Sequence, residues 1–205
     1  MTHTSRLPRR LTQLFLGLVL YGFSMALLVQ SSWGVLPWDV LHQGLAELLG
    51  WSLGSVTISL GIVILLLWIP LRERPGAGTV CNVLIIGFVV DATLAVLPAP
   101  SAWWLRGGFA IAGIVLNAVA TAAYIGVHMG PGPRDGLMTG LVRRTGGSVR
   151  LMRTCIEVVV VATGWLLGGT VGVVTVLYAV LIGPLVQPLL RVVSVGDAGG
   201  GPGTG

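Results

Sequence analysis

The sequence predicts an all-α membrane protein with six transmembrane helices, arranged as two inverted three-helix repeats that each contain a short amphipathic half-helix. Three observations support this prediction: 54% of the residues are hydrophobic and only 9% are charged, the apolar runs are long, and one sequence cassette occurs twice. A soluble domain carries roughly 25% charged residues. The chain therefore has too little polar surface to cover a water-soluble fold.

The apolar runs predict six spans, because a helix needs about 20 residues to cross a bilayer. The spans cover residues 11–31, 53–71, 79–97, 103–127, 151–167 and 173–193. A basic lead-in, residues 1–10, precedes the first span. A glycine-rich tail, residues 194–205, follows the last span and is expected to be disordered.

The cassette lies between the first two spans and returns between the fourth and the fifth. Residues 34–45 read Gly-Val-Leu-Pro-Trp-Asp-Val-Leu-His-Gln-Gly-Leu, and residues 130–141 read Gly-Pro-Gly-Pro-Arg-Asp-Gly-Leu-Met-Thr-Gly-Leu, at an offset of 96 (133 − 37). The same offset also aligns Gly17 with Gly113, Ser52 with Ser148 and Thr79 with Thr175. This pattern predicts an internal duplication with repeat 1 over residues 11–98 and repeat 2 over residues 103–193.

Each cassette predicts a short amphipathic helix, over residues 37–49 and 133–145. Pro37 suits the first helical position, and Asp39 lies in the first turn, where the helix dipole favours an anion. His42 and Gln43 share the polar face with Asp39 and join it as pathway candidates. The favoured interpretation of His42 is a solvated interfacial histidine, and the alternative is a pH-sensitive pair with Asp39. Whether these half-helices re-enter the membrane or lie in its interface stays open.

Arginines fix the expected orientation, since short loops rich in Arg or Lys stay in the cytoplasm. Arginines precede the first span and lie in the loops after the second and fourth spans and at the end of the sixth. The expected protein is a multi-pass protein of a bacterial cytoplasmic membrane with both termini inside. Three spans per repeat, an odd number, then give the repeats opposite orientations, as in many secondary transporters, whose site lies at the repeat interface.

Ionisable residues at membrane depth are the first functional candidates, because a charge there costs about 2.5–3.5 kcal/mol. Asp39 and Asp135 are expected to line a pathway between the repeats, and Arg134 to position a substrate. Asp91, inside the third span, is the candidate for proton exchange, and its repeat counterpart is Gln187. The alternatives are that Asp39 and Asp135 cap their helices and that Asp91 bonds to a neighbouring helix.

A second rank of candidates comprises Glu157, Asn82 and Asn117. Glu157 follows Arg153 by four residues, so a local ion pair is its favoured interpretation. The two asparagines are expected to bond between helices, as single amides in apolar spans do.

Other classes of protein lack support in the sequence. No nucleophile–base pair, phosphate-binding loop or metal cluster is evident, which predicts neither an enzyme nor a cofactor or metal site. The formal charge of +5 comes from arginines at helix ends, which does not indicate nucleic-acid binding. The expected partners are the lipid bilayer and a small-molecule substrate of unknown identity. A homodimer or a partner membrane protein stays open.

The cassettes also carry a resemblance to a known family. The matching residues are Gly-x-x-Pro-Trp-Asp-Val-Leu-x-x-Gly-Leu at 34–45 and Gly-x-Gly-Pro-Arg-Asp-Gly-Leu-Met-x-Gly-Leu at 130–141, continued by Arg143-Arg144-Thr145-Gly146, Arg153, Glu157, Gly164-Trp165 and Gly168-Gly169. In these residues the chain resembles the YczE/YitT-like family of bacterial integral membrane proteins, close to its YczE type. The resemblance implies a small multi-span protein with a transport or export role and no catalytic residues.

The leading hypothesis is a small secondary transporter or exporter of an unidentified small molecule or ion. The alternatives are a non-transporting accessory protein that assists a partner complex and a substrate-binding subunit of a larger transporter. A transporter predicts a polar cavity between the repeats, lined by Asp39, Asp135 or Asp91. An accessory protein predicts a dry, glycine-packed bundle in which these carboxylates are paired.

Overall fold

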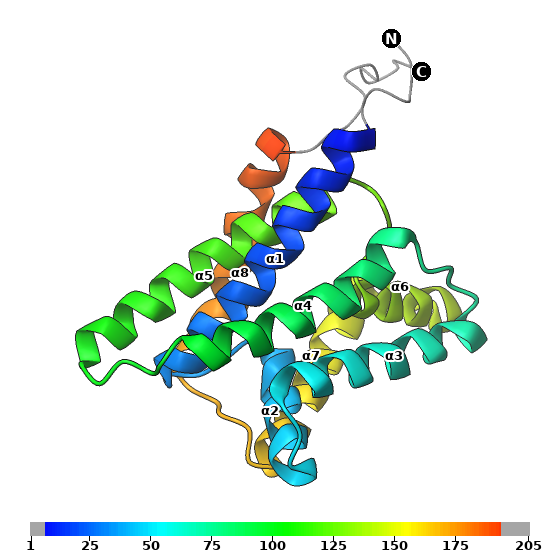
Figure 1. Cartoon of the computed structure of the whole chain (residues 1–205). Coiled ribbons are helices and arrows are strands. Elements are labelled where there is room, and N and C mark those ends of the chain that lie inside the picture. Colours follow the sequence, from blue (N-terminus) through cyan, green and yellow to red (C-terminus); the bar gives the residue numbers. More distant parts are fainter. Residues whose placement is uncertain (1–6, 194–205) are drawn as a thin grey trace.

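A computed structural model describes residues 7–193, which form eight α-helices (Figure 1). They are α1 (Leu7–Ser31), α2 (Pro37–Leu49), α3 (Leu53–Leu71), α4 (Ala77–Val96), α5 (Trp103–Ile125), α6 (Pro133–Thr145), α7 (Val149–Leu166) and α8 (Val173–Val193). Every predicted helix is present. The first begins earlier than expected, so residues 7–10 belong to α1 and not to a separate lead-in. The tail, residues 194–205, lies outside the described residues.

The two half-helices have the same start and end signals. Each begins with a proline and spans 13 residues. Gly50 (φ 68°) and Gly146 (φ 69°) end them in the left-handed conformation, which glycine adopts without steric cost. Both helices are therefore too short to cross a bilayer, which takes about 20 residues.

Five helices between residues 7 and 193 are long and apolar enough to cross a membrane: α1, α3, α4, α5 and α8. The sixth predicted span, α7, is not among them. It has 18 residues, three of which are charged (Arg150, Arg153 and Glu157). The prediction of an all-α membrane fold is confirmed, with five candidate spans.

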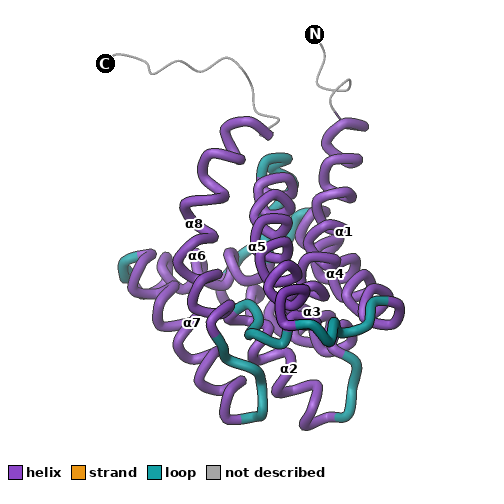
Figure 2. The backbone as a smooth tube through the Cα atoms, turned by 90° about the vertical axis from the view of Figure 1, so that its left-hand side faces the viewer, coloured by secondary structure: helices purple, strands orange, loops and turns teal. Residues whose placement is uncertain are grey.

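The centre of the fold is an antiparallel pair, α1 and α5 (Figure 1). Gly17, early in α1, lies against Ala123 near the end of α5, whereas Gly113 lies against Leu28 near the end of α1. The absence of side chains at these glycines lets the two helices approach closely. The other large interfaces pair α4 with α1, α2 with α7, α3 with α4, α8 with α5, and α6 with α3. In Figure 2, α2, α6 and α7 lie below the upper parts of α1, α5 and α8.

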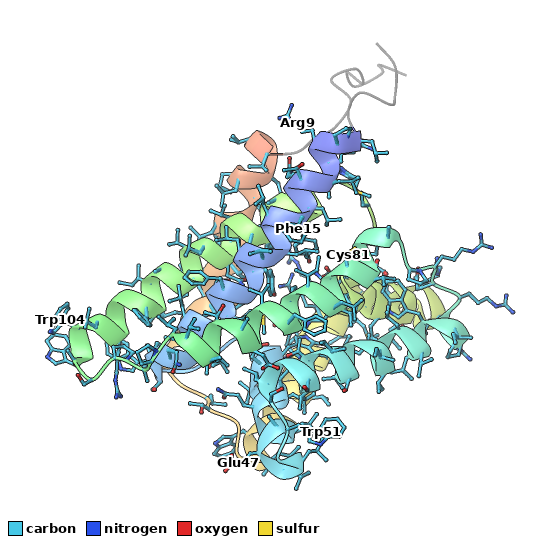
Figure 3. The ribbon with its side chains drawn as sticks, in the orientation of Figure 1. Arg9, Phe15, Glu47, Trp51, Cys81 and Trp104 are labelled. Atoms are coloured by element: carbon cyan, nitrogen blue, oxygen red, sulfur yellow. The ribbon has the colours of Figure 1, made fainter. Side chains whose placement is uncertain are left out.

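Apolar side chains face both inward and outward. One buried cluster lies among α1, α4, α5 and α8, and a smaller one (Trp38, Ile64, Trp68 and Val160) lies where the half-helices meet α3 and α7. Many large apolar side chains are exposed on the outside; Trp51 and Trp104, for example, project from the bundle (Figure 3). Such a surface suits contact with lipid chains.

The helix pairs α3–α4 and α7–α8 differ in their packing. In the first pair Gly87 lies against Ile58 and the backbone of Gly54, and Gly61 lies against Val83. The helices α7 and α8 make no comparable contact. Apart from the neighbouring backbone of α8 itself, no atom of residues 7–193 lies within 4 Å of the place that a Cβ would occupy at Gly183.

Candidate functional site

A cavity of ≈ 360 Å³ lies between the two half-helices and the long helices around them. The N-terminal residues of both half-helices line it: Leu36, Pro37 and Trp38 on one side, and Gly132, Pro133, Arg134 and Asp135 on the other. The first turn of a helix has backbone N–H groups without helical partners, and proline at the first position suits that turn. The repeated cassette therefore delivers two helix N-termini to one cavity.

Asp39 is fully buried and does not itself line the cavity, although its partners His42 and Arg134 do. Its Oδ1 lies 3.0 Å from His42 Nδ1 and 3.5 Å from Arg134 Nη2, and Thr57 Oγ1 lies 3.4 Å from the same histidine nitrogen. Asp39 Oδ2 has no hydrogen-bond partner among the described residues. His42 is 2% exposed and lines the cavity, so it is a buried partner of Asp39 and not a solvated histidine.

Burial and the neighbouring carboxylate act on His42 in opposite directions. Burial lowers the pKa of His42, because it disfavours the charged imidazolium, while the hydrogen bond to Asp39 and its negative charge raise it. The burial effect is larger, so the pKa lies below the ordinary 6.5 and the ring is neutral at pH 7.

Arg134 is a cavity residue whose charge is only partly compensated. Its guanidinium lies 5.0 Å from the centre of the Trp38 ring, a cation–π contact, and 27% of its side chain is accessible. The ion pair with Asp39 is long at 3.5 Å. Within residues 7–193 the guanidinium makes no hydrogen bond, although it has five N–H donors. These donors are free to bind a ligand or water.

Asp135 faces the same cavity and can be reached by water, although protein atoms surround it on most sides. The Tyr124 hydroxyl donates a long hydrogen bond of 3.4 Å to its Oδ2. Burial raises the pKa of Asp135, and the positive charges of Arg134 and Arg153 partly oppose this shift. The carboxylate thus has free acceptor capacity.

Four further sequence candidates have clear positions. Glu157 accepts a hydrogen bond of 3.0 Å from Arg153 Nε, which confirms the predicted local ion pair, and both side chains line the cavity. Asn82 and Gln187 line the cavity from α4 and α8. Asn117 does not; it donates to Ser24 and accepts from Tyr178 in a buried network between helices, as expected of an amide in a span.

Two further pathway candidates lie outside the cavity. Asp91 accepts hydrogen bonds from Ser52 Oγ (2.6 Å) and the backbone N–H of Gly54 (2.7 Å), so it caps the start of α3. The alternative, a bond to a neighbouring helix, is therefore confirmed, and the expected proton exchange loses its geometric basis. Gln43 Oε1 accepts from the backbone N–H of Thr170, which ties α2 to the loop before α8.

Sequence reasoning missed the aromatic part of the site. All three tyrosines of the chain, Tyr21, Tyr124 and Tyr178, line the cavity, together with Trp38. Tyr21 and Tyr124 pack edge to face with their ring centres 6.1 Å apart. A signal was available, since a phenol inside an apolar span usually needs a polar partner.

Metal binding has no support in the described part of the chain. No three His, Cys, Asp or Glu side chains among residues 7–193 converge on one point, and both cysteines are free thiols.

An all-α chain with five candidate spans, an apolar exterior and a polar internal cavity is a multi-pass membrane protein. The chain belongs to the Family of unknown function (DUF6198), whose model matches residues 8–191. It is 38% identical over 181 residues to an "Uncharacterized protein" of Haemophilus influenzae, covering 88% of this chain and 83% of that protein. It is 30% identical over 182 residues to the "Uncharacterized membrane protein YczE" of Bacillus subtilis, covering 87% and 84%. The resemblance to YczE is confirmed. No solved structure matches the chain.

Proposed function

We propose that the chain is a small secondary transporter or exporter in which two inverted three-span units enclose a solute-binding cavity. The observation that carries this proposal is the polar cavity at which the N-termini of α2 and α6 meet. Short helices whose N-termini point into a cavity near the membrane midplane, at the interface of two repeats, are typical of secondary transporters. In this proposal the protein moves its solute without catalysis.

The positions of the helices support two units of common origin. The helices α1, α2, α3 and α4 begin at residues 7, 37, 53 and 77, and α5 to α8 begin 96 residues later, at 103, 133, 149 and 173. Local geometry follows the same offset: Gly34 has φ 115° and Gly130 has φ 122°. Both Ser52 and Ser148 accept a hydrogen bond from the backbone N–H three residues ahead.

Contacts between the units are reciprocal, as a twofold axis requires. The Gly78 N–H donates to Met129 O (2.9 Å), and the Val174 N–H donates to Trp33 O (3.0 Å). Val174 is the repeat counterpart of Gly78, and Met129 is the repeat counterpart of Trp33, because both pairs differ by 96 residues (174 − 78 = 129 − 33). Each unit therefore makes the same contact with the other. The antiparallel run of α1 and α5 supports opposite orientations of the units in the membrane.

The proposal includes α7 as the sixth span, because two of its charged residues, Arg153 and Glu157, pair with each other beside the cavity and need not face lipid. Six spans place both termini on one side. The distribution of arginines supports the cytoplasm as that side.

The unequal packing of α3–α4 and α7–α8 supports a route into the cavity. Glu157 and Gly183 take the places that Gly61 and Gly87 occupy in the first unit. On α7 the charged Glu157 stands where α3 has a glycine. Both Glu157 and Gly183 line the cavity. We therefore place the entrance between α7 and α8.

Flux measurements test this function. The purified chain in proteoliposomes is screened for uptake of radiolabelled amino acids, carboxylates and amines, with and without a proton gradient. We expect saturable uptake of at least one solute, lost in Arg134→Gln and in Asp135→Asn. The matched control Asp91→Asn removes a carboxylate outside the cavity and retains flux. If the wild-type chain moves no solute, the transport proposal is wrong and an accessory role is favoured.

A further inference from the structure

We infer that the cavity binds a small zwitterion, with its carboxylate on the Arg134 guanidinium and its ammonium group on the Asp135 carboxylate. This inference rests on the proposed function and specifies its substrate class. It follows from the charges left uncompensated around the cavity, from their arrangement and from the apolar part of the wall.

The guanidinium of Arg134 supplies the anion-binding half. It makes no hydrogen bond to a described residue and is held over the Trp38 ring, so its orientation is fixed while its donors stay free. A planar guanidinium matches a carboxylate, with two parallel N–H···O bonds. The indole behind it limits the rotamers of Arg134, which reduces the entropy lost when a ligand binds.

The carboxylates supply the cation-binding half. Among residues 7–193, Asp135 accepts one long hydrogen bond from a side chain, and the fully buried Asp39 adds a negative charge behind the cavity wall. An ammonium group carries three N–H donors, which suit such free acceptors. The rings of Tyr21 and Tyr124 beside Asp135 add faces with which a cation can interact.

The charged groups around the cavity favour a zwitterion over simpler ligands. Arg153 and Glu157 neutralise each other, which leaves one positive group, Arg134, and two negative groups, Asp39 and Asp135. A simple anion would bind Arg134 but add a third negative charge beside two carboxylates. A simple amine would offset the net negative charge, but it would leave the N–H donors of Arg134 unused and bring a second positive charge close to that guanidinium. A zwitterion offers each group an opposite charge and leaves the net charge of the cavity unchanged.

The rest of the wall is suited to an apolar substituent. Ile64, Ile86, Ile182 and Val186 line the cavity beyond the charged groups. The volume of ≈ 360 Å³ lies at the lower end of the range for small-molecule sites, roughly 300–1,000 Å³. An amino acid with a medium-sized apolar side chain has this size and polarity.

Three probes with one skeleton test the inference on the full chain purified in detergent. They are L-phenylalanine (zwitterion), 3-phenylpropionate (anion) and 2-phenylethylamine (cation), and their Kd values are measured by calorimetric titration. We expect L-phenylalanine to bind at least tenfold more tightly than either of the others. This comparison uses the wild-type chain and so does not depend on the folding of any variant.

Two variants then assign the two halves of the site. Arg134→Gln is expected to weaken the binding of L-phenylalanine at least tenfold and not to weaken the binding of 2-phenylethylamine. Asp135→Asn is expected to weaken the binding of L-phenylalanine at least tenfold and not to weaken the binding of 3-phenylpropionate. The control is Arg143→Gln, which removes a guanidinium from the same helix outside the cavity, where Arg143 pairs with Glu73. It is expected to bind all three probes as the wild type does.

The inference is overturned if the anion or the amine binds as tightly as L-phenylalanine, or if none of the three binds. Its failure is distinct from failure of the transport proposal. Flux of another class of solute without binding of L-phenylalanine would retain transport and remove the zwitterion. Binding of L-phenylalanine without any flux would retain the zwitterion site and remove transport.

Discussion

The packing that positions Arg134 can be tested with a substitution at Gly136 that would create a clash between α6 and α3. Gly136 lies one turn into α6, directly against the indole of Trp68, which is 1% exposed. A Cβ at Gly136 would lie 2.5 Å from Trp68 Cη2 and 2.6 Å from Cε2. The ring has little freedom to move, because its Nε1–H donates a 3.1 Å hydrogen bond to Pro133 O. The substitution Gly136→Ala therefore forces α6 and α3 apart.

The magnitude follows from two opposing effects. Overpacking a tight interface costs about 1–3 kcal/mol, and a buried ring held by a hydrogen bond places this site in the upper part of that range. Alanine instead of glycine in a helix interior restores up to about 1 kcal/mol. We expect a net loss of roughly 1–2 kcal/mol in the free energy of unfolding. Gly108→Ala on α5 is the matched control, and it should not destabilise the chain. Apart from the neighbouring backbone of α5 itself, no atom of the described residues lies within 4 Å of its Cβ position.

The assay is unfolding in detergent, followed by the near-UV signal of the tryptophans. A double-mutant cycle isolates the contact: Trp68→Leu alone costs roughly 2–4 kcal/mol through the space that it leaves. It also removes the atoms that clash, so the double variant should be more stable than the sum of the single effects by roughly 1–3 kcal/mol. Additive effects within about 0.5 kcal/mol would refute the proposed contact.

Three further predictions concern single polar groups. Asp91→Ala leaves the start of α3 and Ser52 without their acceptor, and should cost roughly 0.5–2 kcal/mol in chemical denaturation; an unchanged midpoint would contradict the capping role. Asn117→Leu removes two interhelical hydrogen bonds of about 0.6 kcal/mol each and should lower stability by about 1 kcal/mol, measured in the same way. Burial lowers the pKa of His42, so the unfolded chain takes up a proton below pH 6.5 that the folded chain does not, and stability should fall as the pH drops below that value. Melting temperatures between pH 7.5 and 5.5 should show a smaller fall for His42→Gln, which removes the titrating partner of Asp39.

Much of the helical framework could be predicted from the sequence because its signals are local. The bounds 37–49 and 133–145 follow from a proline at each start and a glycine after each end, and they agree with the structure. Long apolar runs gave the spans to within a few residues. The first helix was placed too late because arginines in the first turn of a helix look the same as a polar lead-in.

The site could be predicted only in part, because contacts across the bundle depend on which helix faces which. The cassette residues Asp39, His42 and Arg134 come together, although the favoured interpretation of His42 was a solvated side chain. A bond from Asp91 to a neighbouring helix was one alternative, but its partners could not be identified, since they lie 37 and 39 residues away at the start of α3. The tyrosines escaped notice because single aromatic residues in apolar runs carry no spacing signal.

The glycine contacts between α3 and α4 set a limit on how the molecule changes shape. If the two units exchanged conformations during a cycle, α3 and α4 would have to separate as far as α7 and α8 already are. The close approach of Gly87 to the backbone of Gly54 opposes such separation, because every contact there would be lost at once. The second pair has no such contact to break. We therefore expect movement to be confined to the C-terminal half, with the N-terminal half acting as a static support throughout any cycle.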